Sequence, residues 1–125
     1  MSNWTRLHYL YMSGKDLTGT IPSDIGAYSN LLELLADDNR LSGMLPSELG
    51  VLTLLQTLNL AGNNFTDSVP EEMEFLESNG SLAVLNLTGN PLLSGPLADD
   101  ICAVDELDFD CGDLCGCDSC PCLAV

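Results

Sequence analysis

One pattern of apolar residues recurs every 24 positions along most of this 125-residue chain. The stretch 31–53 carries the pattern clearly, with Asn39, Gly43 and Pro46 at fixed offsets between leucines. The same register returns one window upstream and one window downstream, and it places these leucines at equivalent positions: Leu10, Leu34 and Leu58. A fixed period of this size indicates a solenoid, in which each unit buries its apolar face against its neighbours.

Each unit opens with apolar residues in the order Leu-x-x-Leu-x-Leu, and this alternation predicts a short strand. Leucines face the interior, the residues between them face solvent, and stacked units pair their strands into a parallel sheet. Asn39, Asn63 and Asn90 share one offset, where a side-chain amide can satisfy backbone groups freed as the strand turns away. Lys15 holds that offset in the first unit, so we expect the asparagine ladder to be broken there.

The second half of each unit carries glycine and proline at fixed offsets. Gly19, Gly43 and Gly95 supply a backbone position without a Cβ, whereas Asp67 holds this position in the third unit. Prolines at 22, 46 and 70 fix φ on the return side, and one turn of helix is predicted after each, with Ser23 and Ser47 as caps. Regular helix should be sparse.

The register divides the chain into about four units and a tail. Residues 1–106 form the predicted repeat domain, with units at 7–30, 31–54, 55–81 and 82–106. The third unit is three residues longer than the first two, and Asn79-Gly80 marks the expected place of the insertion because this pair favours a tight turn. A fifth unit opens at Leu107, and the segment 107–125 is predicted to be an acidic, cysteine-rich C-terminal cap.

Acidic residues dominate the charge of the chain, with 19 Asp and Glu against 3 Lys and Arg and a formal net charge of -16. This balance argues against binding to nucleic acid or to an anionic membrane. The acids of the tail meet no Lys or Arg, which indicates a solvated acidic surface. The segment 108–112 only faintly resembles a calcium loop and lacks the later bidentate Glu, so we expect neither a metal site nor a cofactor.

Export is indicated by four glycosylation sequons, which begin at Asn3, Asn64, Asn79 and Asn86. No run approaches the ~20 apolar residues that span a bilayer, and the Met1 end lacks a signal peptide. We therefore expect an extracellular or cell-surface protein whose given chain is truncated, with a membrane tether only in a longer parent chain.

The cysteines all lie in the last quarter of the chain, at Cys102, Cys111, Cys115, Cys117, Cys120 and Cys122. An even count beside sequons favours disulfides that staple the tail over the last leucine layer, although the sequence does not choose the pairing. The alternative is a thiolate metal cluster, because Cys115-Gly-Cys117 and Cys120-Pro-Cys122 have metal-binding spacing. In a reducing compartment, the metal cluster would be favoured over disulfides.

The repeats resemble the plant-type leucine-rich repeat, whose consensus is LxxLxLxxNxLxGxIP. Three segments match it: LHYLYMSGKDLTGTIP, LLELLADDNRLSGMLP and LQTLNLAGNNFTDSVP. The resemblance covers roughly residues 4–106 and implies an α/β solenoid, a right-handed superhelix with a concave parallel β-sheet and little regular helix. Such repeats serve recognition in receptor-like kinases, receptor-like proteins and secreted enzyme inhibitors. The cysteine-rich end is similar to the closing segments of exported members of the family.

Recognition fits the sequence better than catalysis does. His8 is the only histidine, and neither a serine nor a cysteine stands in a motif that would pair with it, so we expect no enzyme activity. The solvent-facing strand positions instead form a predicted ligand-binding surface of Tyr9, Tyr11, Glu33, Leu35, Asp37, Thr57 and Asn59. Its aromatic and apolar side chains beside carboxylates suit a protein or peptide that carries basic groups. Exposed tyrosines also raise β-propensity without any partner.

These observations predict an extracellular leucine-rich repeat module, receptor-like in type, that binds a protein or peptide ligand through its concave face. One alternative is a secreted inhibitor of a cell-wall-degrading glycoside hydrolase. Another is a structural or adhesive cell-wall protein, for which no saturable partner should exist.

Overall fold

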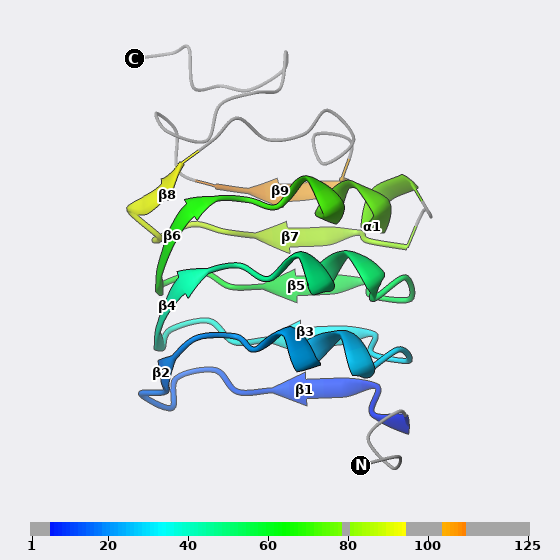
Figure 1. Ribbon diagram of the computed structural model, residues 1–125, viewed down its shortest axis with the longest axis horizontal. Helices are drawn as coiled ribbons and strands as arrows, with labels where there is room; N and C mark the ends of the chain where they lie inside the picture. Colours follow the sequence, from blue (N-terminus) through cyan, green and yellow to red (C-terminus); the bar gives the residue numbers. More distant parts are fainter. Residues whose placement is uncertain (1–5, 79–80, 95–103, 110–125) are drawn as a thin grey trace.

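Two parallel β-sheets run along the axis of the molecule and are joined on the remaining side by short helices (Figure 1). The computed structural model describes residues 6–78, 81–94 and 104–109. The first sheet has five strands in the order β1 (Tyr9–Tyr11), β3 (Glu33–Leu35), β5 (Thr57–Asn59), β7 (Val84–Asn86) and β9 (Glu106–Asp108). The second has four, β2 (Thr18–Gly19), β4 (Arg40–Met44), β6 (Asn64–Ser68) and β8 (Leu92–Ser94).

The five-stranded sheet has the register that the 24-residue period predicts. Its central row pairs one leucine from each unit with the next: Leu10, Leu34, Leu58, Leu85 and Leu107. The α/β solenoid and its parallel sheet are thereby confirmed, and the fifth unit expected at Leu107 supplies strand β9. The four-stranded sheet was not predicted.

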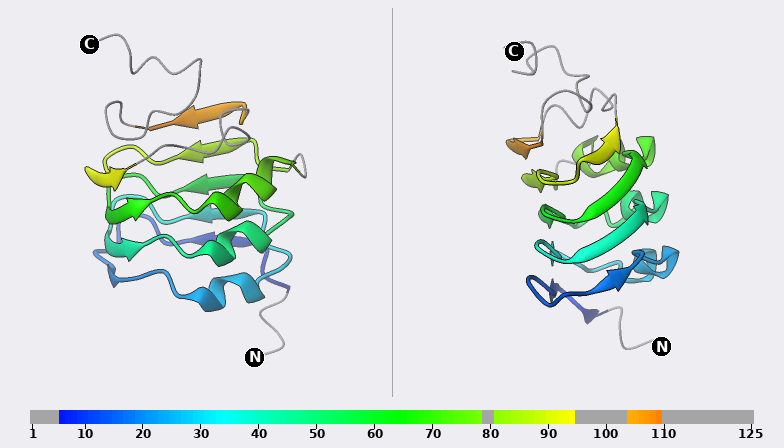
Figure 2. Two further views of the ribbon diagram at one scale, coloured as in Figure 1. Left: turned by 45° about the horizontal axis from the view of Figure 1, so that its top comes forward. Right: turned by 90° about the vertical axis from the view of Figure 1, so that its left-hand side faces the viewer.

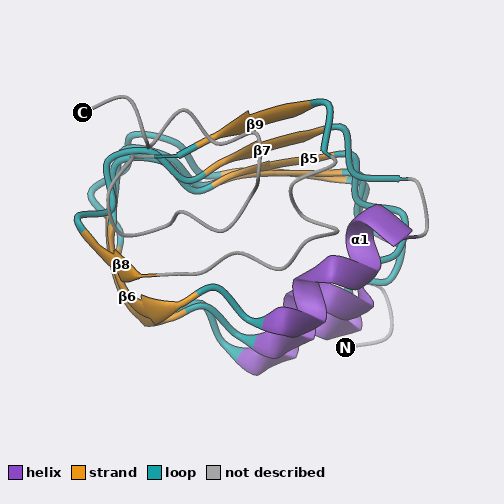
Figure 3. Cartoon of the chain, turned by 90° about the horizontal axis from the view of Figure 1, so that it is seen from above, coloured by secondary structure: helices purple, strands orange, loops and turns teal. Residues whose placement is uncertain are grey.

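The core lies between the two sheets and the helices, in layers that repeat along the axis (Figure 3). Each layer contributes leucines from the five-stranded sheet and one apolar residue from the opposite sheet, such as Leu41, Phe65 or Leu93. Every layer packs only on its neighbours, so the fold has no single central core. Its stability comes from the contacts between successive layers along the axis.

Helix is short, as expected, but its caps differ from the prediction. The 3₁₀ helices η2 (Ser23–Ala27) and η3 (Ser47–Val51) begin one residue after a proline, and that proline is the N-cap without a side-chain hydrogen bond. The prediction that Ser23 and Ser47 cap the helices is therefore wrong, because each serine is already the first helical residue.

The helical segment of the longer third unit is extended by as many residues as the unit itself. Helix η4 (Glu71–Met73) has three residues and continues directly into α1 (Glu74–Ser78), which has five. Together they span eight residues where η2 and η3 span five each, and the difference of three equals the extra length of the unit. The pair Asn79-Gly80, where the insertion was expected, lies outside the described residues.

The asparagine ladder forms as predicted, with Asn39, Asn63 and Asn90 all buried. The Asn39 amide nitrogen donates to the Met12 carbonyl of the preceding unit at 2.8 Å, while its Oδ1 accepts from the Lys15 and Leu17 backbone N–H groups at 3.0 Å each. The asparagine of the second unit thus satisfies the backbone of the first, where lysine replaces it. Each ladder residue bonds its own turn and the turn before it, so the ladder links successive layers.

Several sequence predictions fall outside the described residues. These are the sequons at Asn3 and Asn79, the later repeat landmark Gly95, and the six cysteines of the tail. In the part of the chain that the structure describes, no helix has the length and apolar character needed to cross a membrane.

Candidate functional site

The outward side of the five-stranded sheet, termed here the concave face, collects the sequence-predicted site residues. The middle leucine of each strand faces the core, and it is buried in β3, β5 and β7 and half-buried in β1 and β9. The residues before and after it therefore point away from the core. The register aligns them in two rows across the strands. The first row is Tyr9, Glu33, Thr57, Val84 and Glu106, and the second row is Tyr11, Leu35, Asn59, Asn86 and Asp108.

The two tyrosines and Glu33 form one cluster at the β1 end of this face. The Tyr11 hydroxyl donates a hydrogen bond to the Glu33 carboxylate on the adjacent strand. This bond, with smaller effects of desolvation and of the Glu33 charge, raises the pKa of Tyr11 above its ordinary value of 10.0. The rings of Tyr9 and Tyr11 lie 6.1 Å apart at 44°, and both remain more than half exposed. The cluster therefore presents aromatic surface next to a carboxylate.

Asp37 lies just beyond the strand and belongs to the same acidic region. The Ser13 hydroxyl of the preceding unit donates a hydrogen bond to its carboxylate. Both donors are neutral hydroxyls, so these bonds bring no positive charge to Glu33 or Asp37. Among the residues described here, the one ion pair joins Arg40 and Asp16 at 3.8 Å, and both of those side chains are exposed.

The middle of the concave face is neutral. Thr57 and Val84 occupy the first row there, and Asn59 and Asn86 occupy the second. The side-chain oxygens of Asn59 and Asn86 accept hydrogen bonds from the Ala61 N–H and the Thr88 N–H, both at 3.1 Å. These asparagines thus stabilise the turns that follow their own strands, in addition to lining the face.

Sequence reasoning missed two acidic residues of this face, Glu106 and Asp108. It assigned Asp108 to the acidic cap and Glu106 to the end of the fourth unit, whereas both flank Leu107 on the last strand of the sheet. The signal was present, because Leu107 stands in the register of the interior leucines and its two neighbours must then point outward. All seven residues of the predicted binding surface lie on this face or at its border, in units one to three.

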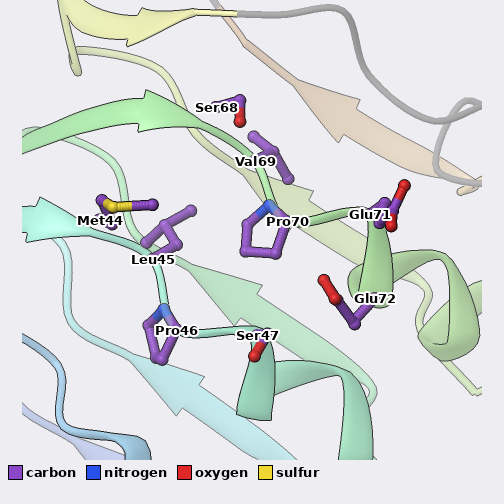
Figure 4. A pocket seen from close by; sticks show the side chains of 9 residues that line it. All are labelled: Met44, Leu45, Pro46, Ser47, Ser68, Val69, Pro70, Glu71 and Glu72. Carbon is purple, nitrogen blue, oxygen red and sulfur yellow. The ribbon is translucent and has the colours of Figure 1, made fainter.

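A groove lies on the opposite side of the molecule, between units two and three (Figure 4). It has a volume of about 580 Å³, and Met44, Pro46 and Pro70 contribute apolar walls with Glu71 and Glu72 at one end. Its two serines, Ser47 and Ser68, lie in a lining without histidine, lysine or cysteine. The titratable groups of the groove are thus the carboxylates of Glu71 and Glu72.

The rest of the described chain contains one histidine and scattered acidic side chains. His8 is exposed and lies edge-on to Tyr9, with their ring centroids 6.2 Å apart. Within residues 6–78, 81–94 and 104–109, no three His, Cys, Asp or Glu side chains gather closely enough to hold a metal ion.

The arrangement of parallel strands, turns and asparagines matches known proteins. A family model described as Leucine Rich Repeat matches residues 54–76, which cover the third unit from its strand into α1. This chain is a leucine-rich repeat protein. No curated protein sequence matches it.

Solved structures similar to this leucine-rich repeat protein come from plant receptors. The BIR3–SERK2 complex from Arabidopsis thaliana is 29% identical with a TM-score of 0.74, and the match covers 95% of this chain and 66% of that one. The ectodomain of the membrane receptor kinase GASSHO1/SCHENGEN3 from Arabidopsis thaliana, in complex with CASPARIAN STRIP INTEGRITY FACTOR 2, is 32% identical with a TM-score of 0.76, covering 93% and 13%.

A third similar structure is the Arabidopsis receptor kinase HAESA in complex with the peptide hormone IDA and the co-receptor SERK1. It is 26% identical with a TM-score of 0.74, and the match covers 91% of this chain and 22% of the receptor. The chain thus spans from 13% to 66% of the length of these three proteins.

Proposed function

We propose that this leucine-rich repeat protein is an extracellular recognition module that binds a protein or peptide through its concave face. The observation that carries the proposal is the cluster of exposed Tyr9 and Tyr11 beside the uncompensated Glu33, with Leu35 and Asp37 next to it. Exposed aromatic rings supply apolar contact area at a low entropic cost. The similar structures include receptor ectodomains in complex with peptides, which supports the same use of the fold here.

The chemistry of the face favours a partner with basic groups. Within the described part of the chain, the hydrogen bonds to the carboxylates of Glu33 and Asp37 come from neutral hydroxyls, and neither carboxylate forms an ion pair. A lysine or arginine of the partner would therefore add a charge-assisted bond at this face. Charge complementarity of this kind speeds association and selects among partners more than it adds affinity. Nucleic acid does not fit, since its phosphates would meet a protein with a net charge of -16.

The proposed mechanism is binding to a rigid surface without turnover. Parallel strands paired across five units hold the contacting side chains in a fixed register, so little ordering is needed when a ligand arrives. Extracellular location is part of the proposal and is supported by the receptor ectodomains among the similar structures and by the sequon at Asn64, which is exposed on β6. The disulfide-stapled cap after the repeats remains a proposal that rests on the sequence.

A selection from a random linear peptide library on the immobilised full chain tests this proposal. Peptides that bind should be enriched in Lys and Arg, and their affinity should fall as salt rises. Thr57→Arg places a cation and a long side chain in the centre of the concave face, and we expect it to weaken the selected peptides by at least about 10-fold, or 1.4 kcal/mol.

Ser47→Arg is the matched control, because it adds the same side chain at an exposed position on the groove side. We expect this variant to bind the selected peptides within about 2-fold of the unsubstituted chain, and circular dichroism should show both variants folded. If Ser47→Arg abolishes binding and Thr57→Arg does not, the groove is the binding site and the proposal is wrong. It is equally wrong if no library peptide binds saturably.

A further inference from the structure

We propose, on the basis of the proposed function, that the concave face selects an extended peptide with two cationic side chains four residues apart. Two sites on this face carry carboxylates, and they are termed here the near pole and the far pole. The near pole is Glu33 beside Tyr9 and Tyr11, and the far pole is Glu106 with Asp108. The neutral middle of the face lies between them.

The sheet register sets the distance between the poles. Glu33 pairs with Thr57, Thr57 with Val84, and Val84 with Glu106, so three strand-to-strand steps separate the two glutamates. Neighbouring strands lie about 4.8 Å apart, which places Glu33 and Glu106 roughly 14 Å from each other. Figure 1 shows these strands stacked one above the next from β3 to β9.

An extended peptide that crosses the strands advances about 3.4 Å per residue, so roughly 14 Å corresponds to four residues. Side chains alternate along such a peptide, and residues i, i+2 and i+4 therefore point to the same side. Cations at i and i+4 would meet the two poles, while the side chain at i+2 would lie over Thr57 and Val84. A small or uncharged side chain suits that middle position.

The poles act as separate sites rather than as one diffuse field. The Debye length is about 8 Å at physiological ionic strength, which is shorter than the roughly 14 Å between them. A single cation therefore gains from one pole only, and two cations placed closer together leave the far pole unpaired. Neither pole forms an ion pair within the described residues.

The two poles also differ in what surrounds them. Tyr9 and Tyr11 stand next to Glu33, and the bond from Tyr11 to that carboxylate fixes the ring beside it. A guanidinium at the near pole would reach both the carboxylate and an aromatic face, an arrangement that suits arginine better than lysine. Strand β9 brings no aromatic residue to the far pole, so either cation would serve there.

Synthetic peptides of fixed composition test the spacing. Capped seven-residue glycine–serine peptides would carry two arginines at positions 2 and 6, at 2 and 4, or at 3 and 4. Their binding to the full ¹⁵N-labelled chain would be followed by NMR titration at 0.15 M salt. The peptide with four-residue spacing gains one more surface ion pair than the others, so we expect it to bind about 2- to 5-fold more tightly.

The double variant Glu106→Gln, Asp108→Asn removes the far pole without changing size. We expect it to lower the affinity of the four-residue peptide to that of the closer spacings and to leave those unchanged. Glu71→Gln, an exposed acid on the groove side, is the matched control and should change none of the three affinities by more than about 1.5-fold.

Two results overturn the inference, and they are distinguishable from failure of the proposed function. If all spacings bind equally, or the double variant leaves the preference intact, the two-pole arrangement is wrong even where Thr57→Arg still blocks binding to the concave face. If none of the three peptides shifts the amide signals of β3, β5 and β7 while selected library peptides still do, only the two-pole arrangement is wrong. If no library peptide binds, or if the shifts centre on Met44 and Glu72, both proposals are wrong.

Discussion

Asn63 stands in the middle of the asparagine ladder, and Asn63→Ala should remove four hydrogen bonds at once. Its amide nitrogen donates to the carbonyls of Ala36, Leu60 and Ala61 at 2.9, 3.1 and 3.1 Å, and its Oδ1 accepts from the Leu41 N–H at 3.0 Å. Each bond contributes about 1 kcal/mol net, and an unpaired buried N–H costs about 1–3 kcal/mol. We expect the free energy of unfolding to fall by about 3–5 kcal/mol.

Urea unfolding of the full chain, followed by far-ultraviolet circular dichroism, measures this change. Asn64→Ala is the control, because it removes the same side chain from the next residue, which is exposed. We expect that control to change stability by less than about 0.5 kcal/mol. A loss below about 1 kcal/mol for Asn63→Ala would refute the reasoning, since the ladder would then not stabilise the stacked turns.

Three further outcomes are expected. Gly50→Ala should destabilise the chain by about 1–3 kcal/mol in the same urea assay, because a Cβ there would lie 2.3 Å from the Glu72 carbonyl oxygen of the adjacent helical turn. Asp67→Gly should stabilise it by about 0.5–1 kcal/mol, because Asp67 has φ 62 in the left-handed region, and unchanged stability would count against strain there. Tyr11 should ionise above pH 10.0 in an ultraviolet titration, and Glu33→Gln should bring its pKa back down. A phenol that holds its proton more tightly when folded adds stability below pH 10.0, and that stability is lost as the pH rises through the raised pKa.

The five-stranded sheet could be predicted because its signal is local and repeated. Within one strand the buried leucine and its two exposed neighbours differ in polarity, and the period then aligns Leu34 with Leu58 and Leu85. The asparagine ladder was equally accessible, since one residue type recurs at one offset. The sequence also showed that Lys15 replaces the asparagine in the first unit. It did not show that Asn39 of the second unit accepts the hydrogen bonds of the Lys15 and Leu17 backbone N–H groups.

The four-stranded sheet was missed because its strands have a weaker pattern. β4 contains Gly43, and β2 has only two residues, so neither looks like a strand by propensity. What forms this sheet is the solenoid itself: once the first sheet and the ladder are stacked, the segments after each asparagine lie side by side and bond to each other. Figure 2 shows the two sheets following the same axis. Pairing imposed by neighbouring units cannot be read from one unit alone.

The predicted binding residues came from the same alternation as the fold. This origin explains why they lie on one face and why the set does not reach the last strand. The alternation identifies which side chains point outward, so it brought Tyr9, Tyr11, Glu33 and Leu35 together correctly on one face. It cannot tell how far the sheet continues where the repeat degenerates. Glu106 and Asp108 were therefore left in other segments.

Within each strand of the five-stranded sheet, inward side chains stabilise the core and outward side chains line the concave face. The proposed function can therefore be tested by substitutions that leave the chain stable. Leu58 is fully buried in the core, whereas the adjacent Thr57 lies on the concave face and is only half-buried. A substitution at Thr57 changes what a ligand meets, but it leaves the leucine layers and the asparagine ladder in contact. Changes in affinity at outward positions should therefore not follow changes in the free energy of unfolding. A solenoid can vary its recognition surface in this way because each side chain of a strand belongs either to the stacked core or to the face, and the backbone pairing between strands is the same for both.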